Sequence, residues 1–120
     1  MFYDNPKVLY LSVHRYEHGE FWPELRESNF NYVGKGEGAG HNINIPLNKV
    51  GMGNADYMAI FNNIVLPVAY EYQPELVIIS SGYDAAIGCP EGHMEVTPCA
   101  YAHMLKLSHG SCWWKSVRCA

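Results

Sequence analysis

The sequence predicts an α/β fold, because two strand-like apolar runs flank a long segment with helical periodicity. Residues 7–14 and 75–81 are short, nearly continuous apolar runs rich in β-branched side chains. This pattern is typical of strands buried on both faces of a parallel sheet. Apolar side chains recur every three or four positions across residues 54–72, which indicates one face of a helix. The order strand, loop, strand, helix, strand is typical of α/β proteins.

The first half of the chain supplies two of these strands. We expect the first to end at His14. Residues 15–40 are charged, aromatic and rich in glycine with no sustained period, which predicts a long loop able to carry function. Residues 42–47 alternate polar and apolar side chains and predict a short strand closed by Pro46. Pro67 should kink the helix that follows.

The second half contains the third strand and one more helix. The run at residues 75–81 leads directly into Gly82-Tyr83-Asp84. Thr97 as N-cap and Pro98 at the first helical position predict a short helix over residues 97–105. Residues 108–120 have no clear period, and we assign no element to them.

Composition excludes some classes of protein. The chain has 120 residues with 48% apolar content, enough for one globular unit or part of one. Eight basic against 12 acidic side chains, a net charge of −4, argue against direct binding of nucleic acid. An export signal and an apolar run of about 20 residues are both absent from the sequence, so we expect no membrane association and a cytoplasmic and/or nuclear location. Four scattered cysteines without a C-x-x-C pair indicate reduced thiols.

Several residues are candidates for chemistry, each with a structural alternative. Asp84 follows a predicted central strand, where parallel sheets place ligand sites, although a carboxylate there can also cap a turn. His14 and His18 have a spacing that suits zinc on a helix, but here they span a strand end and a loop, which favours ordinary hydrogen bonding. Trp22, in Phe21-Trp22-Pro23, is either part of a packed lid or the wall of an apolar pocket. The alternating glycines at residues 34–40 precede a strand rather than a helix, which favours a flexible turn over a phosphate site.

Four blocks of sequence together resemble class IIb histone deacetylases. They are Val8-Leu-Tyr-Leu-Ser-Val-His-Arg-Tyr-Glu-His-Gly-Glu-Phe-Trp-Pro23, Val50-Gly-Met-Gly-Asn-Ala-Asp-Tyr57, Leu66-Pro-Val-Ala-Tyr70 and Pro74-Glu-Leu-Val-Ile-Ile-Ser-Ser-Gly-Tyr-Asp-Ala-Ala86. Within this class, these sequence blocks are most similar to the first catalytic domain of the tandem-domain tubulin deacetylase type. The resemblance covers about residues 2–107, so we interpret residues 1–107 as an internal portion of such a domain and residues 108–120 as a divergent tail.

The resemblance implies the arginase-deacetylase fold, a parallel sheet flanked by helices, of which the N- and C-terminal parts are missing here. In that family zinc is held by two aspartates and one histidine, a histidine pair shuttles protons, and a tyrosine stabilises the oxyanion. Asp84 matches the second aspartate ligand. The other ligands, the histidine pair and the tyrosine have no match in this chain, so no catalytic residue is assigned.

The resemblance also implies substrate and cation contacts. Trp22 matches an aromatic wall of the acyl-lysine tunnel. Two structural monovalent cations, potassium or sodium, are expected from backbone donors: one site at Ser12 and Val13, the other at Phe2, Asn5, Val8 and His41. Glu91 matches the gatekeeper position at the tunnel mouth, where an acidic group is similar to that of the polyamine deacetylase of the same class and would attract a second ammonium. The alternative is a solvated loop glutamate.

Three functions stay open at this point. The parent domain deacetylates lysine of histones or tubulin, or it deacetylates an acetylpolyamine, or this chain is a non-catalytic shortened isoform that binds the parent's partners. We expect the chain alone to be inactive, because a catalytic zinc takes about three protein ligands. We also expect uncovered apolar strand edges at residues 77–79, a hazard for aggregation.

Overall fold

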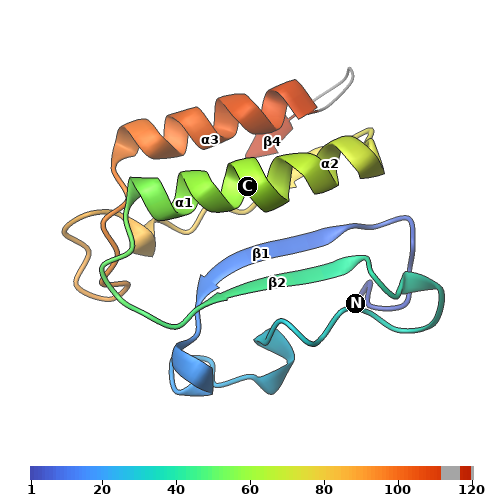
Figure 1. Ribbon diagram of the computed structural model, residues 1–120, viewed down its shortest axis with the longest axis horizontal. Coiled ribbons are helices and arrows are strands. Elements are labelled where there is room, and N and C mark those ends of the chain that lie inside the picture. The colour runs from blue at the N-terminus through green and yellow to red at the C-terminus, as the bar shows by residue number, and fades with distance from the viewer. Residues whose placement is uncertain (112–116, 120) are drawn as a thin grey trace. The chain divides into compact units, whose positions relative to one another are not determined.

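Two short parallel sheets organise the chain, one in each of its two units (Figure 1). The computed structural model describes residues 1–111 and 117–119, and the units are Met1–Val50 and Gly51–Ala120. Residues 112–116 and 120 of the predicted tail lie outside the described residues. Among the helices that are described, none is long and apolar enough to cross a membrane.

In unit 1, β1 (Tyr10–Arg15) pairs in parallel with β2 (Asn42–Leu47). The prediction of β2 is confirmed, but the start of the first strand was placed too early. Residues 2–8 turn instead, since the amide of Asn5 donates to the carbonyl of Phe2 at 3.0 Å and that of Val8 to Asn5 at 3.3 Å. The expectation that this strand is buried on both faces was also wrong: its residues are exposed or half-buried, and unit 1 supplies only short turns as cover.

The predicted loop of residues 15–40 contains three single turns of 3-10 helix: Glu17–Gly19, Arg26–Ser28 and Gly36–Gly38. Its middle is tied to β2 by Asn44, which is buried. The Asn44 side-chain amide donates to the carbonyls of Glu27 and Asn29 at 3.0 and 3.2 Å. One side chain therefore pairs the carbonyl of Glu27 and gives that of Asn29 a donor in addition to the amide of Tyr32.

In unit 2, the predicted helix of residues 54–72 forms as α1 (Asn54–Ile60), a π-helical turn (Phe61–Val65) and α2 (Leu66–Tyr72). The backbone stays helical throughout, and the disturbance expected from Pro67 is this π turn. Proline has no N–H to bond the carbonyl four residues earlier, and its ring crowds that turn. α1 begins where the Asp56 carboxylate accepts the amide of Gly53 at 2.9 Å.

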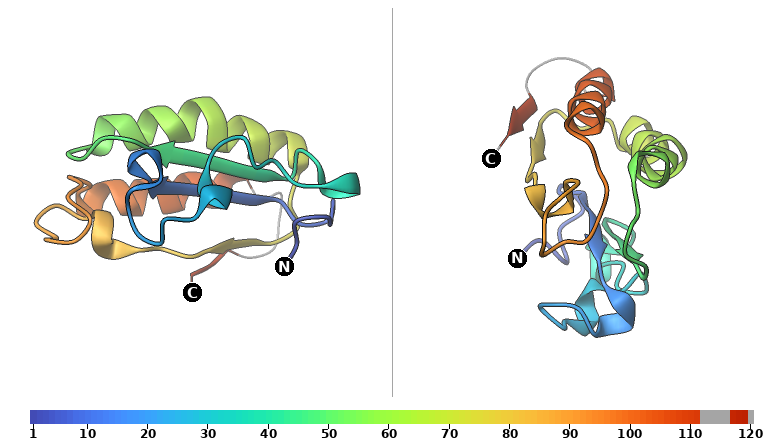
Figure 2. Two further views of the ribbon diagram at one scale, coloured as in Figure 1. Left: turned by 90° about the horizontal axis from the view of Figure 1, so that it is seen from below. Right: turned by 90° about the vertical axis from the view of Figure 1, so that its left-hand side faces the viewer.

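The last helix, α3 (Pro98–Ser111), lies beside α1 and α2 (Figure 2). The prediction of Thr97 as N-cap is confirmed: its hydroxyl accepts the amide of Ala100 at 3.4 Å. The helix is longer than predicted, and inside its extension the Ser108 hydroxyl donates to the carbonyl of Met104 at 2.9 Å. Asn54 and Thr97 exchange two hydrogen bonds of 2.9 Å, which join the starts of α1 and α3.

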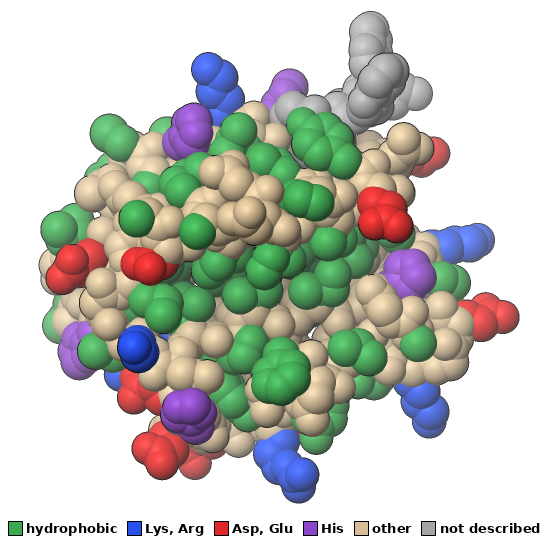
Figure 3. Space-filling view, viewed as in Figure 1, with side chains coloured by type: hydrophobic (Ala, Val, Ile, Leu, Met, Phe, Trp, Pro, Cys, Tyr) green, Lys and Arg blue, Asp and Glu red, His purple; other side chains and the backbone are tan. Residues whose placement is uncertain are grey.

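β3 (Val77–Ile79) pairs in parallel with β4 (Val117–Cys119). The predicted strand over residues 75–81 is correct in place but too long, because among the described residues only three find ladder partners. The expectation of uncovered edges holds only in part, since β4 covers one edge of β3. Ile78 remains 66% exposed. Separately, hydrophobic side chains also lie at the surface on the face drawn in Figure 3. Exposed apolar surface of this kind marks either an interaction surface or a tendency to aggregate.

Replacing Asn44 with Asp should release the middle of the loop, because a carboxylate cannot donate to the carbonyls of Glu27 and Asn29. We expect a loss of about 1–3 kcal/mol of unfolding free energy in unit 1 and faster hydrogen exchange at the amide of Tyr32, which donates to the carbonyl of Asn29. The control is Asn31→Asp, which makes the same change at an exposed position of the same loop. Equal exchange rates in both variants would contradict the role of Asn44.

Candidate functional site

Asp84 lies in a single 3-10 turn, Tyr83–Ala85, that follows β3. Its side chain is exposed, and among the described residues no basic side chain lies within ion-pair distance of it. A carboxylate just beyond the carboxyl end of a parallel strand occupies the usual ligand position of such sheets. The prediction of Asp84 as a ligand is therefore compatible with its geometry.

The backbone holds this turn in place. The amide of Val96 donates to the carbonyl of Ala85 at 3.1 Å, and the amide of Ile87 donates back to Val96 at 2.9 Å. Val96 is fully buried. The Asp84 turn is thereby attached to the segment that leads into α3.

The backbone of Gly92 lies so close to the turn that no side chain would fit between them. A Cβ at this position would be 1.9 Å from the carbonyl oxygen of Asp84, so only glycine fits. This supporting role of Gly92 is not predicted by the sequence. A single glycine eight positions after Asp84 gives no sign in the sequence that the two backbones touch.

Tyr83 is part of the turn, and Tyr57 and Tyr101 lie close enough for the charge of Asp84 to affect their pKa values. The Tyr101 hydroxyl donates to the carbonyl of Gly82 at 3.2 Å, and the rings of Tyr83 and Tyr101 are 5.4 Å apart. Burial, and then the charges of Tyr101 and Asp84, raise the pKa of Tyr57 to about 12. Burial also raises the pKa of Tyr101, with smaller contributions from Asp84, Tyr83 and Cys89. The phenols of Tyr57 and Tyr101 therefore stay neutral, and their hydroxyls stay hydrogen-bond donors.

A complete zinc site does not form from the described residues. Among them no group of three or more His, Cys, Asp or Glu side chains could hold a metal ion, whereas a catalytic zinc needs about three protein ligands. The described residues thus fit a zinc site only as the source of one of its ligands. His14 follows the hydrogen-bonding alternative: its Nε2 donates to the carbonyl of Ser28 at 2.8 Å, and its Nδ1 accepts the Ser12 hydroxyl at 2.9 Å.

The predicted cation donors lie in unit 1. Ser12 and Val13 are in the middle of β1. The carbonyl of His41 accepts the amide of Tyr10 at 2.9 Å, and a Cβ on Gly38 would lie 2.7 Å from the backbone nitrogen of Asn5. The turn of Phe2, Asn5 and Val8 and the carbonyl of His41 therefore lie at the same end of the two-stranded sheet. Each bonded carbonyl keeps a second lone pair, so the cation assignments stay predictions that this geometry permits.

The two predicted substrate contacts are both exposed. Trp22 belongs to unit 1 and is 79% exposed at the tip of a turn in which the amide of Glu24 donates to the carbonyl of Phe21 at 2.8 Å. Glu91 belongs to unit 2 and lies directly before Gly92. Its backbone position is consequently tied to that of the Asp84 turn.

Comparison with known proteins identifies the family. The model of the histone deacetylase domain matches residues 1–119. Polyamine deacetylase HDAC10 of Homo sapiens is 57% identical over 107 residues, which cover 89% of this chain and 16% of the human protein. Histone deacetylase 6 of Caenorhabditis elegans is 49% identical over 105 residues, 88% of this chain and 11% of the worm protein. The solved structure of the histone deacetylase Clr3 matches 98% of this chain and 20% of its own, with a TM-score of 0.90 and 45% identity.

The protein is thus a deacetylase-type α/β chain, and the fold prediction is confirmed: it adopts part of the arginase-deacetylase fold. The chain belongs to the histone deacetylase family, whose members are hydrolases. It spans 16% of the length of the human relative.

The raised pKa of Tyr57 makes stability depend on pH. A phenol whose pKa rises from 10.0 to about 12 on folding stabilises the folded state fully below pH 10, and this contribution is lost as the pH rises towards 12. We expect Tyr57→Phe to flatten that part of the curve of unfolding free energy against pH. Tyr70→Phe, at an exposed position of α2, is the control. A curve for Tyr57→Phe that falls as steeply as that of the unaltered chain would contradict the assignment.

Proposed function

We propose that this chain contributes one zinc ligand, Asp84, and one substrate wall, Trp22, to a zinc-dependent deacetylase that hydrolyses an N-acetylated amine. The observation that carries the proposal is the exposed Asp84 carboxylate after β3, fixed by backbone contacts and without an ion-pair partner among the described residues. Membership of the histone deacetylase family supports it. Acetylated lysine of histones or tubulin is the first substrate class that we propose.

The residues of this chain have binding and positioning roles in such a reaction. Asp84 would hold its carboxylate oxygens at a fixed place, because its backbone is bonded on one side and packed against Gly92 on the other. The indole of Trp22 would cover apolar methylenes of the acylated side chain. Since the described residues supply a single ligand, we derive no bond-making step from them. A structural potassium or sodium ion at the carbonyls of unit 1 and a cytoplasmic or nuclear location are part of the same proposal.

Asp84 can be tested in a chimera in which this chain replaces the matched 107 residues of the human relative. Asp84→Asn should lower bound zinc, measured by elemental analysis, and reduce deacetylation by more than the ~100-fold that loss of an outer-shell partner costs. Asp4→Asn, at an exposed position, is the control. Full zinc content and activity in the Asp84 variant would refute its role, and zinc-dependent hydrolysis by the unmodified chain alone would refute the expectation that it is inactive.

A second candidate, deacetylation of an acetylated polyamine, is favoured by Glu91. Its carboxylate is exposed in the segment that also carries Gly92, so it could attract the second ammonium of a polyamine. At ~4 Å such an attraction is about 1 kcal/mol in water and larger at a drier site. Four relatives named as polyamine deacetylases are 56–58% identical to this chain, compared with 49% for histone deacetylase 6 of Caenorhabditis elegans.

The same chimera separates the two substrate classes. If Glu91 recognises an ammonium, Glu91→Gln should lower kcat/KM for acetylspermidine by about fivefold, the equivalent of ~1 kcal/mol, and leave an acetyl-lysine peptide unaffected. Glu95→Gln, at an exposed position four residues later, should change neither. A chimera that has the higher kcat/KM for the peptide, unchanged by Glu91→Gln, would contradict the polyamine hypothesis and favour acetylated lysine as the substrate.

A further inference from the structure

We propose that Arg15 is a positioning residue for Trp22, acting through the ring of Phe21. The inference rests on the proposed function only for the use of Trp22 as a substrate wall. The positioning itself depends on contacts within unit 1.

The Arg15 side chain is held between two partners. Its guanidinium lies over the Phe21 ring, with 4.0 Å from Cζ to the ring centroid. Its Nε donates to the carboxylate of Glu17 in an ion pair. The Arg15 side chain is only 14% exposed, and low exposure strengthens both contacts. Arg15 ends β1, so it connects the sheet directly to the residue before Trp22.

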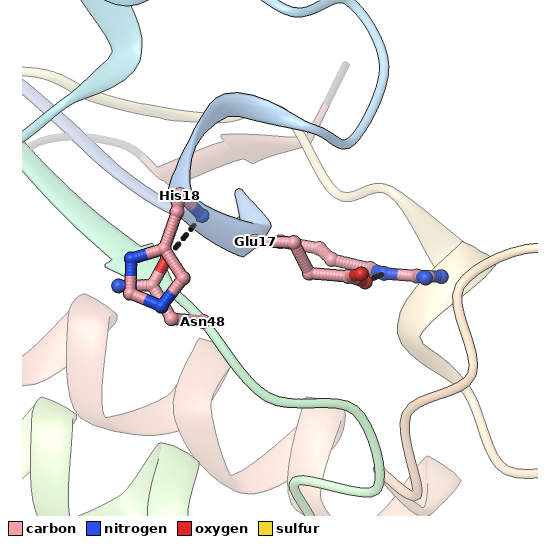
Figure 4. Close-up of polar contacts among 4 residues, drawn as sticks. Glu17, His18 and Asn48 are labelled. Carbon is pink, nitrogen blue, oxygen red and sulfur yellow. Dashed lines mark hydrogen bonds and ion pairs between the residues drawn. The ribbon is translucent and has the colours of Figure 1, made fainter.

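The turn between Arg15 and Phe21 has an unusual backbone. Glu17 and His18 have φ values of 47° and 57°, in the left-handed region that non-glycine residues rarely adopt. The amide of His18 donates to the Asn48 side chain at 2.8 Å (Figure 4). Left-handed residues in succession cost free energy and persist only where the surroundings hold them. Here the holding contacts are His18 to Asn48 and Glu17 to Arg15.

Tyr16, at the start of the turn, anchors its backbone. It is buried, and its carbonyl accepts the amides of Gly19 at 2.9 Å and Phe21 at 3.2 Å. The backbone of Phe21 is therefore fixed by Tyr16 and its ring by Arg15. Trp22 follows at an exposed position, so its order comes from its neighbour rather than from its own burial.

The test uses the full chain with Trp113 and Trp114 changed to Phe, which leaves Trp22 as the single tryptophan. Time-resolved fluorescence anisotropy reports the nanosecond motion of the loop that carries Trp22. A guanidinium–ring contact at a partly exposed site shifts the ratio of ordered to released loop by about two- to fivefold. We expect this shift for Arg15→Met and for Phe21→Leu, and no further shift in the double variant. Arg15→Lys keeps the charge but not the planar stacking group and should lie between.

Arg26→Met, an exposed arginine of the same loop, is the matched control and should change nothing. Circular dichroism establishes that each variant is folded; if Arg15→Met is not, Phe21→Leu and Arg15→Lys decide. Unchanged anisotropy in the folded Phe21 variant, additive effects of the two substitutions, or an equal effect of Arg26→Met would overturn the proposal. This measurement needs neither zinc nor substrate, so its failure is distinct from a failure of the Asp84 test.

Discussion

The Asp84 turn depends on backbone hydrogen bonds to the segment before α3. Val96 bonds to Ala85, the last residue of the turn, and to Ile87 just after it, and its neighbour Glu95 donates its amide to the carbonyl of Met52 at 2.8 Å. The same short segment therefore fixes the turn, the residues before α1 and the start of α3. Because these are main-chain bonds, most side-chain substitutions leave them intact. The frame of unit 2 can persist while the exposed side chains at positions 84 and 91 vary.

Unit 1 is held together in a different way. Its long loop has little regular structure, and much of its attachment comes from side chains of β1, β2 and the residue after β2, among them Arg15, His14, Asn44 and Asn48. One substitution can remove a side chain that makes several hydrogen bonds. The carbonyls left without a donor then lower the free energy of unfolding. The loop that carries Trp22 is therefore more sensitive to side-chain changes than the turn that carries Asp84.

The sequence predicts features that rest on local patterns better than features that rest on contacts between distant residues. The elements were recognisable because apolar runs and a helical period repeat over many residues, as in β2 and in the helix of residues 54–72. Boundaries were harder: β1 starts late because of the turns around Asn5, and β3 is short because its length depends on β4, a distant part of the chain. Asp84 was found from its place after a strand. Gly92 and Arg15 were not, because their roles come from contacts that no local pattern records.

The surroundings of Asp84 favour a ligand role over a structural one. A carboxylate that only stabilises a fold is usually paired or capped, whereas Asp84 is exposed and has neutral phenols around it, with no basic side chain within ion-pair distance among the described residues. Burial is the largest cause of the raised pKa of Tyr57 and Tyr101, and the negative charge of Asp84 adds to it. Water alone can solvate the exposed carboxylate of Asp84, and a cation held jointly with other ligands would neutralise its charge more completely. The electrostatics of the turn thus point in the same direction as its position at the end of the strand.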